Sequence, residues 1–499
     1  MRNKLLAISL CVILLASCRK NDLHEYAHED ASTFSVIGSL TVGGEGAAEI
    51  TAYDPTTKKL FVVTNSDPQT RIDIVDLSNP AMPMQIGFID ISPYGGGVNS
   101  VAVSDGKLAA AVEGFQKTDN GKVVIFSTND NSLVKQIAVG ALPDMVTYSH
   151  DGKYILSANE GEPNDAYTID PAGTVSIISV KENYSVVTLG FEDFAGKEGS
   201  LKSKGFRIFG PNANFATNIE PEYITIDKDS KTAWVTLQEN NGIAKIDIKS
   251  KKITAIFPLG FKSYNLTANG IDPSDRDNAI GLLNPWPVRG MYQPDAIAVF
   301  DDGGTPYLFT ANEGDVREWS GFAENKRVKD LTLDALAFPD ATLRTDPKIG
   351  RLNVTTTLGD DDADGDYDAL YSFGARSFSV WNGNSGNLLY DSKNELEKKC
   401  IDALQYDDAR SDDKGVEPEG ITLGIVGKKA VAFVGLERAD AVAIYDVTNP
   451  VSPKFIKLLK SGDAPEGLTF IHAKYSPTKK SLLVVSSEND GTIKVYSVN

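Results

Sequence analysis

The sequence predicts an all-β fold, a seven-bladed β-propeller built from four-stranded antiparallel blades. Three observations lead to this prediction. Seven hairpins of apolar strands align with one another, a third apolar strand follows each hairpin, and an extra strand near the N-terminus supplies the one that the last repeat lacks. Repeated strand groups of this kind are typical of architectures in which each unit packs against its neighbours.

Each hairpin joins an apolar strand that begins with a polar residue to a second apolar strand that ends with one. In chain order the pairs read AAEITAY with LFVVTNS, VNSVAV with LAAAVEG, LPDMVTY with YILSANEG, EPEYITI with TAWVTLQEN, QPDAIAV with YLFTANEG, EPEGITL with AVAFVGLER, and APEGLTF with LLVVSSEND. The third strands read RIDIVDL, KVVIFST, TVSIISV, IAKIDI, RSFSVWN, AVAIYDV and TIKVYSV. Short apolar runs bounded by turn residues indicate β-strands.

Most repeats also offer a fourth strand, such as MQIGFID, LVKQIAVG or KFIKLLKSG, but the seventh repeat ends at Asn499 without one. The segment from Phe34 to Gly43, FSVIGSLTVG, is similar to KFIKLLKSG and precedes the first hairpin. We therefore expect this N-terminal strand to complete the last blade, which leaves few free sheet edges. Two β-sandwiches are the competing architecture, but they would not explain seven aligned copies.

The N-terminal residues MRNKLLAISLCVILLASCRK have the order of an export signal: positive charge, an apolar run, then small residues before a cysteine. We interpret residues 1–17 as a lipoprotein signal peptide and Cys18 as the lipidated residue. Residues 18–33 would be a flexible tether, and residues 34–499 the propeller, with long inserted loops on one face. An ordinary signal peptide with a chance cysteine is the alternative.

The expected location follows from this signal. Its apolar run is too short for a permanent membrane span, so the only membrane contact would be the lipid anchor. Arg19 rather than Asp follows the cysteine, which is typical of outer-membrane sorting. We expect an exported outer-membrane lipoprotein that faces either the periplasm or the cell surface.

Composition restricts the partners. The chain has 68 acidic and 49 basic side chains and a formal net charge of −19, without a cluster of Lys and Arg that would neutralise phosphates, so nucleic acid is not an expected partner. Cys11 leaves with the signal and Cys18 would carry lipid, which leaves Cys400 alone. No intramolecular disulfide is expected.

Acidic residues recur where the first strand of each hairpin begins and the second ends. Because the two strands run antiparallel, these positions meet on one rim of a propeller. Twelve of the fourteen positions are acidic, and their carboxylates would raise one another's pKa unless cations neutralise them. Simple capping of strand ends is the alternative. The candidate metal ligands of this rim are Asp144, Glu160, Glu222, Glu239, Asp295, Glu313, Glu419, Glu437 and Glu466.

A second candidate metal site lies in the longest insertion, which contains GDDDADGDYD. A D-x-D-x-D-G turn places alternate carboxylates around one hard cation, although Tyr371 stands where an EF-hand has its bidentate Glu. We expect Ca²⁺, and no zinc, because the ligands are all oxygens. A solvated acidic loop is the alternative. The candidate ligands are Asp360, Asp362, Asp364, Asp366 and Asp368.

Five arginines lie in or beside the inserted and closing segments, where they could bind an anionic ligand such as phosphate or carboxylate. Each one alone is more often a salt-bridge partner of a neighbouring acid. The five are Arg207, Arg289, Arg317, Arg376 and Arg438.

The stretch His24-Glu25-Tyr26-Ala27-His28 matches the zinc-peptidase pattern H-E-x-x-H. It lies in a polar segment six residues after the expected lipid anchor, where a helix would have no apolar face to pack. We therefore interpret the match as chance.

Further motifs add a family resemblance over nearly the whole chain, from about Glu49 to Val498. They include GVNSVAV with AAAVEG, SANEGEPND, GFRIFGPNAN, GIDPSDRDNAI, PWPVRGMYQPDAI with TANEGD, GDDDADGDYDALYSFGARSFSVW, and EPEGI with VGLER. The sequence resembles the choice-of-anchor I family, which includes chains labelled alkaline-phosphatase-like and mesenchyme-specific cell-surface glycoproteins. The resemblance implies a seven-bladed propeller attached to a surface by one of several anchors.

Two functions remain open. The first is a divalent-cation-dependent binding module at the cell surface for an unknown small-molecule or surface ligand that could bear phosphate. The second is a Ca²⁺-dependent phosphoesterase, by analogy with propeller phytases. The sequence shows no familiar phosphatase nucleophile, so we favour binding and assign no catalytic residue.

Overall fold

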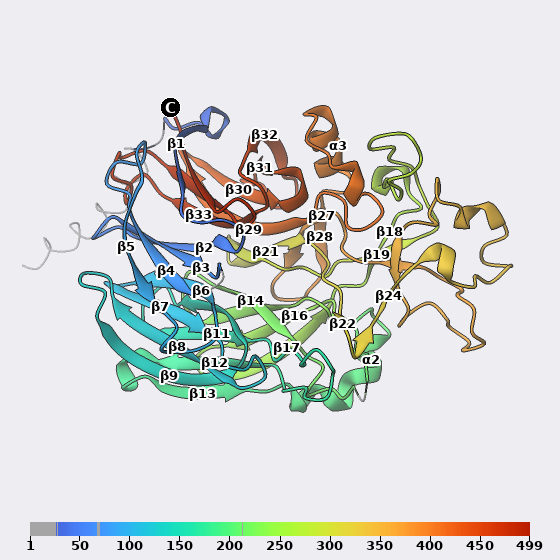
Figure 1. Ribbon diagram of the computed structural model, residues 1–499, viewed down its shortest axis with the longest axis horizontal. Helices are drawn as coiled ribbons and strands as arrows, with labels where there is room; N and C mark the ends of the chain where they lie inside the picture. Colours follow the sequence, from blue (N-terminus) through green and yellow to red (C-terminus); the bar gives the residue numbers. More distant parts are fainter. Residues whose placement is uncertain (1–25, 27, 67–69, 212) are drawn as a thin grey trace, which may run out of the picture.

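The computed structural model describes residues 26, 28–66, 70–211 and 213–499. Its β-strands form seven four-stranded antiparallel sheets, which confirms the predicted all-β propeller architecture. Figure 1 shows these sheets fanned around one centre, with their first strands inside and their fourth strands outside.

The sheets follow one another along the chain. The first three are formed by β2 (Ala47–Asp54), β3 (Lys59–Thr64), β4 (Arg71–Asp76) and β5 (Met84–Asp90); by β6 (Val98–Ser104), β7 (Lys107–Val112), β8 (Asn120–Ser127) and β9 (Leu133–Ala141); and by β10 (Pro143–Tyr148), β11 (Tyr154–Asn159), β12 (Thr174–Ser179) and β13 (Ser185–Leu189). The next two are formed by β14 (Pro221–Ile226), β15 (Thr232–Leu237), β16 (Gly242–Asp247) and β17 (Lys252–Pro258); and by β20 (Ile297–Asp302), β21 (Thr305–Asn312), β27 (Ser377–Asn382) and β28 (Leu388–Asp391).

The last two sheets close the ring. They are formed by β29 (Pro418–Val426), β30 (Lys429–Leu436), β31 (Ala441–Asp446) and β32 (Lys454–Lys460); and by β33 (Pro465–Ile471), β34 (Leu482–Ser487) and β35 (Thr492–Ser497) with β1 (Ser35–Thr41). β1 pairs antiparallel with β35, so the N-terminal strand completes the last sheet as predicted. The first strands contact one another in the closed order β2, β6, β10, β14, β20, β29, β33 and back to β2.

Burial along each strand follows its position in the sheet. The second strands β7 and β11 bury five consecutive residues, because neighbouring sheets cover both of their faces. The outer strand β5 instead exposes Met84, Ile86 and Phe88. The continuous apolar runs of the sequence therefore correspond to the interior strands.

The long insertions pack into a body of their own, which we call the inserted body (residues 261–291 and 313–376). It contains a three-stranded sheet of β18 (Phe261–Ser263), β19 (Arg289–Met291) and β26 (Tyr371–Ser372), and two strand pairs, β22 (Glu318–Trp319) with β23 (Phe322–Ala323) and β24 (Asn325–Arg327) with β25 (Asn353–Thr355). Buried Tyr264, Val328, Ile349 and Leu352 belong to its core. Figure 1 shows this body beside the blades, at the right.

Short helices occur in the connections. α2 (Glu198–Lys202) lies between β13 and β14, and α3 (Glu395–Asp402) lies between β28 and β29. Within the described residues, no helix is both long enough and apolar enough to span a membrane.

The N-terminal boundary differs from the expected one. Residues 18–33 were expected to be flexible, but Tyr26 and Glu29 are buried and Ala31–Thr33 forms a 3-10 turn before β1. The packed unit therefore begins before Phe34. The predicted signal peptide, Cys18 and most of the HEYAH motif lie outside the described residues.

Candidate functional site

Four of the first strands begin with a β-bulge that redirects one side chain. The antiparallel register shifts at Pro143/Met145, Pro221/Ile224, Pro418/Ile421 and Pro465/Leu468. A bulge adds one residue on one strand and turns its side chain out of the regular alternation. The acidic residues at these points are Asp144, Glu222, Glu419 and Glu466.

Strained backbone precedes four of the acidic residues. Leu142, Gln293, Glu417 and Ala464 each stand directly before a proline and have φ of 46°, 39°, 47° and 56°. A residue other than glycine in this region costs roughly 1–3 kcal/mol and persists only where the surroundings impose it. Strain repeated at equivalent positions marks this rim, which we call the mouth, as a functional region.

The mouth encloses a cavity of about 260 Å³, the mouth cavity. It brings together six of the nine acidic residues predicted for the rim, and adds Asp315. The six are Asp144, Glu222, Asp295, Glu313, Glu419 and Glu466. The other three, Glu160, Glu239 and Glu437, follow the second strands but do not line the cavity.

The carboxyl groups of the mouth are buried close to one another. Burial, followed by repulsion from neighbouring carboxylates, raises the pKa values of Glu222, Asp295, Glu419 and Glu466 well above their usual range. Burial also raises the pKa of Asp144 to about 6. A bound cation would reverse both effects and restore the ionised forms.

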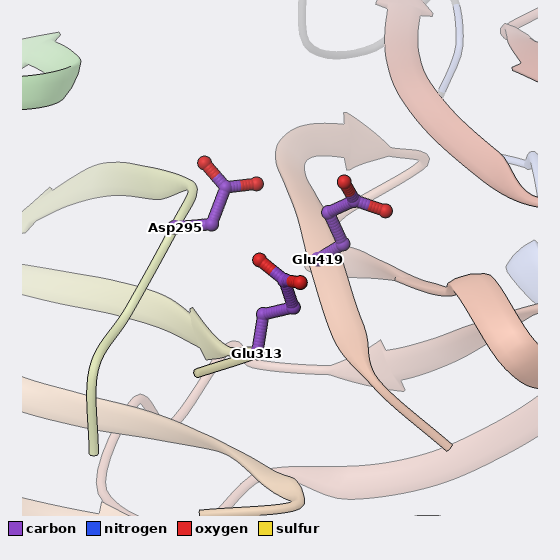
Figure 2. A group of neighbouring side chains, drawn as sticks. All are labelled: Asp295, Glu313 and Glu419. Carbon is purple, nitrogen blue, oxygen red and sulfur yellow. The ribbon is translucent and has the colours of Figure 1, made fainter. Parts of the chain in front are cut away.

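Asp295, Glu313 and Glu419 form the closest group of carboxylates in the mouth cavity. One oxygen from each lies within 4.8 Å of the others. Figure 2 shows the three side chains converging from two neighbouring blades. The Oε2 atom of Glu419 is buried and accepts no hydrogen bond from the described residues. The same holds for Oε2 of Glu222 and of Glu466 on other blades.

Lys414 is the functional residue that the sequence did not reveal. Its Nζ lies 2.5 Å from Glu313 Oε1 and 3.2 Å from Glu417 Oε2, while Gln238 Nε2 donates to Glu313 Oε2 at 3.0 Å. Burial alone would raise the pKa of Glu313, but Lys414 and Gln238 outweigh it and hold that pKa below its usual value. Glu313 is therefore the ionised member of the group.

A second group, Glu313, Glu417 and Glu437, adjoins the first and shares Glu313 with it. Here the positive charge is already supplied by the protein. Lys414 contacts Glu313 and Glu417, and Arg438 lies 3.5 Å from Glu417 and 2.8 Å from Glu437. The group that includes Asp295 and Glu419 is consequently the better cation site of the two.

Three of the five predicted anion-binding arginines are buried in ion pairs. Arg207 pairs with Glu324, Arg317 with Glu220 at 2.6 Å, and Arg376 with Glu397 at 3.2 Å. The guanidinium groups of Arg207 and Arg317 also lie on the ring of Phe209, at 4.0 and 4.4 Å from its centre. These arginines hold the inserted body and its neighbours together instead of facing the mouth cavity.

The other two arginines differ from each other. Arg289 is exposed and donates to Tyr371 Oη at 2.6 Å. Arg438 is one-third exposed and lies beside the mouth, where it pairs with Glu417 and Glu437. Among the five, Arg438 is the one whose printed ion pair in the described structure includes a predicted rim carboxylate, Glu437.

The residues 360–368, which we call the aspartate loop, form two smaller groups. Asp360, Asp362 and Asp368 come together, and Asp368 also groups with Asp366 and Asp334. Asp364 belongs to neither group; it accepts the backbone N–H of Asp366 at 3.1 Å. None of these residues lines the mouth cavity, so the two predicted metal sites are separate.

The fold and the site together define a class of protein. It is a β-propeller with an acidic cavity on one face, lined by residues at bulged and strained strand ends. The chain belongs to the choice-of-anchor I family, whose domain model matches residues 49–450. Membership of this family indicates an exported or cell-surface protein.

Two curated relatives are similar over parts of the chain. Gigasin-3a of Magallana gigas is 27% identical over 191 residues, which cover 32% of this chain and 67% of that protein. The mesenchyme-specific cell surface glycoprotein of Strongylocentrotus purpuratus is 24% identical over 336 residues, which cover 58% of this chain and 41% of that protein. The matched region thus spans less than half of the sea-urchin protein.

Among solved structures, the hydrazine synthase of Kuenenia stuttgartiensis superposes with a TM-score of 0.50 at 12% identity. The superposition covers 91% of this chain and 96% of that chain. At this identity the likeness concerns the fold alone.

Proposed function

We propose that this protein is a divalent-cation-dependent binding module at the cell surface, and that Asp295, Glu313 and Glu419 hold the cation in the mouth cavity. The observation that carries the proposal is the convergence of these three carboxylates with a buried, unpartnered oxygen on Glu419. A buried carboxylate oxygen without a partner is costly unless a cation or donor satisfies it.

Calcium is the cation that suits these ligands best. All the ligand atoms are carboxylate oxygens, which favour Ca²⁺ or Mg²⁺ over zinc. Ca²⁺ accepts six to eight oxygens, so three carboxylates leave positions for water or for a bound ligand. Mg²⁺ holds its own water shell more tightly and needs a stricter geometry.

The ligand would be a small acidic group. The cavity of about 260 Å³ is smaller than typical sites for drug-sized molecules. Its walls are acidic, so an anion enters only by contacting the bound cation. A carboxylate or phosphate on a larger surface molecule fits both conditions.

A Ca²⁺-dependent phosphoesterase is the second candidate. Glu222 and Glu466 favour it, because they line the same cavity and burial, with repulsion from neighbouring carboxylates, raises their pKa values, which is the direction that a general acid requires. The three buried arginines disfavour it, since they are unavailable to bind a transferring phosphoryl group. Turnover of a phosphomonoester that requires Ca²⁺ and is lost in Glu222→Gln would favour the enzyme.

We also propose that Cys18 carries the lipid that anchors the exported protein to the outer membrane. The order of charge, apolar run, small residues and cysteine in the sequence supports this anchor. Intact mass of the membrane-extracted protein tests it: a diacylglycerol adduct on the wild type and none on Cys18→Ser is the expected result.

Calorimetric titration of chelator-treated protein with Ca²⁺ tests the cation site. We expect binding in the wild type, and a loss of affinity of at least tenfold in Asp295→Asn and Glu419→Gln, which keep the side-chain shape and remove the charge. Asp362→Asn, which removes a charge from the aspartate loop, is the matched control and should retain the affinity. Binding that is unchanged in both mouth variants would contradict the proposed site.

A further inference from the structure

The described chain begins on the face of the propeller opposite the mouth. The Tyr26 ring packs edge-on against His472, with ring centres 5.6 Å apart. Glu29 accepts hydrogen bonds from the backbone N–H of Ser481 at 2.8 Å and from its hydroxyl at 2.7 Å. Asn499 donates its N–H to Thr33 Oγ1 at 3.0 Å. These contacts fix where the N-terminal segment leaves the propeller.

His472 and Ser481 bound the turn between β33 and β34. Glu466 lies at the other end of β33, and Glu488 directly follows the other end of β34, both on the mouth side. Because the two strands are antiparallel, this turn lies a full strand length from the mouth. A strand of seven residues spans about 23 Å.

The two hairpin turns beside this exit, which we call the lysine-rich face, carry positive charge, with the exposed Asp30 next to them. The turn carries Lys474, Lys479 and Lys480, and the neighbouring turn between β29 and β30 carries Lys428; all four side chains are exposed. Neither turn contains an acidic residue. This charge is the reverse of that in the mouth, and it complements an anionic lipid surface, where each Lys near the membrane contributes about 1 kcal/mol.

Exposed apolar and aromatic side chains lie among these lysines. Tyr475 is 54% exposed in the same turn, and Ile425 is 36% exposed at the end of β29. Ile425 also lines a mainly apolar cavity of about 400 Å³ with Phe470 and His472. Tyrosine with lysine is a combination typical of residues at a membrane interface.

The length of chain between the expected lipid anchor and Tyr26 limits how the propeller can be oriented on the membrane. Arg19 to Tyr26 is eight residues, which reach at most about 28 Å when fully extended. To bring the mouth onto the membrane, this segment would have to pass around the rim, cover the strand length and also clear the inserted body. The strand length alone takes about 23 Å of this reach of about 28 Å, so the segment favours an orientation in which the face that holds Tyr26 is nearer the membrane.

We infer that the lysine-rich face lies on an anionic lipid surface and that the mouth opens away from the membrane. This inference rests on the proposed lipid anchor at Cys18. In this orientation the mouth cavity and the inserted body face the surrounding medium, where a ligand on another molecule can reach the cation site. The lysines would add electrostatic attraction to the hydrophobic attachment of the lipid anchor.

The orientation can be measured on the lipidated full chain in phosphatidylcholine vesicles that contain phosphatidylglycerol and lipids with nitroxide head groups. One fluorophore is placed at Lys480→Cys on the lysine-rich face, and another at Glu45→Cys on the mouth side; Cys400 is fully buried. We expect the lipids to quench the label at 480 several-fold more than the label at 45. Equal quenching, or stronger quenching at 45, overturns the orientation.

A charge comparison measures the lysine contribution separately. The unlipidated Cys18→Ser protein should bind vesicles more weakly when Lys428 and Lys480 are changed to Gln, by several-fold and only when phosphatidylglycerol is present. Changing the exposed Lys204 and Lys326 to Gln is the matched control and should have little effect. Equal effects of the two pairs contradict the proposed lipid-facing surface.

The outcomes also distinguish the proposal of calcium binding in the mouth from the proposed orientation on the membrane. If no lipid adduct is found on the wild type, the anchor and this orientation both fail, while calcium binding in the mouth is unaffected. If Ca²⁺ does not bind, the quenching result still decides the orientation.

Discussion

The two acidic regions of this protein differ in how their charges are satisfied. The aspartate loop is mostly exposed, and its carboxylates accept backbone N–H groups of their own turn, such as Gly365 N to Asp360 and Asp361 N to Asp368. In the mouth the carboxylates are buried among their neighbours, and Glu222, Glu419 and Glu466 each have a buried oxygen without a partner, whereas in the described loop only Asp360 Oδ1 does. The D-x-D-x-D-G motif therefore identifies a turn. The burial of carboxylate oxygens without a partner identifies the region that a cation would stabilise most.

Replacing Lys414, in the mouth, is expected to have the largest effect on the free energy of unfolding. We expect Lys414→Met to lower the free energy of unfolding by about 3–5 kcal/mol, because it leaves Glu313 and Glu417 buried without their ammonium partner. Urea unfolding of the chelator-treated variant measures the loss. We further expect added Ca²⁺ to restore part of it, by binding where Nζ stood.

The matched control for this variant is Lys348→Met. Lys348 pairs with Asp340 at 2.9 Å on the surface of the inserted body, where a single ion pair contributes little. If both variants lose the same free energy of unfolding, the positive charge in the mouth stabilises the protein no more than a charge on an exposed surface does.

The pH dependence of the metal-free protein gives an intermediate effect. Burial, followed by repulsion from Glu488, raises the pKa of Glu49 from about 4.5 to about 8. Between these values the folded protein binds more protons than the unfolded chain, so the free energy of unfolding falls as pH rises. Most of this destabilisation should therefore develop between about pH 5 and pH 8.

The variant Glu49→Gln separates this contribution from the rest. In this variant the free energy of unfolding should fall less over this pH range, by on the order of 1–3 kcal/mol, because an amide does not ionise. Glu192→Gln removes an exposed charge from the connection between β13 and β14 and should leave the slope nearly unchanged. Unfolding in urea with chelator, at several pH values, compares the three proteins. A Glu49→Gln slope identical to that of the wild type would contradict the buried, repelling mouth.

The sequence predicted the propeller well because each strand group repeats. KFIKLLKSG corresponds to β32, and FSVIGSLTVG to β1, which pairs with β35 as expected. The inserted body was not predicted as a unit with its own core. Its strands are only two or three residues long, and its buried residues, such as Tyr264 and Ile349, come from irregular segments without a period.

The site was predicted in part for the same reason. The acidic residues that recur at the strand ends included Asp295 and Glu419, and in the structure a residue with positive φ stands before the proline that precedes each of them. Lys414 occurs once and has no counterpart in other repeats, so no pattern could reveal it. The arginines were predicted as possible anion ligands, with salt bridges to neighbouring acids as the alternative, and the sequence alone does not show that Arg376 is buried against Glu397.

The smallest effect is expected in the aspartate loop, and it decides whether the comparison between the two regions holds. Asp360→Asn, Asp362→Asn and Asp368→Asn together should change the free energy of unfolding by no more than about 0.5 kcal/mol per residue, because the loop is mostly exposed and only Asp360 Oδ1 among its described oxygens is buried without a partner. The stabilisation by Ca²⁺ should persist, because it arises in the mouth; a hundredfold excess over Kd gives about 2.7 kcal/mol. Melting curves of the triple variant with Ca²⁺ and with chelator measure both quantities. If the triple variant loses the Ca²⁺ response while Glu419→Gln keeps it, the cation binds in the loop, and the buried carboxylates of the mouth do not require a metal.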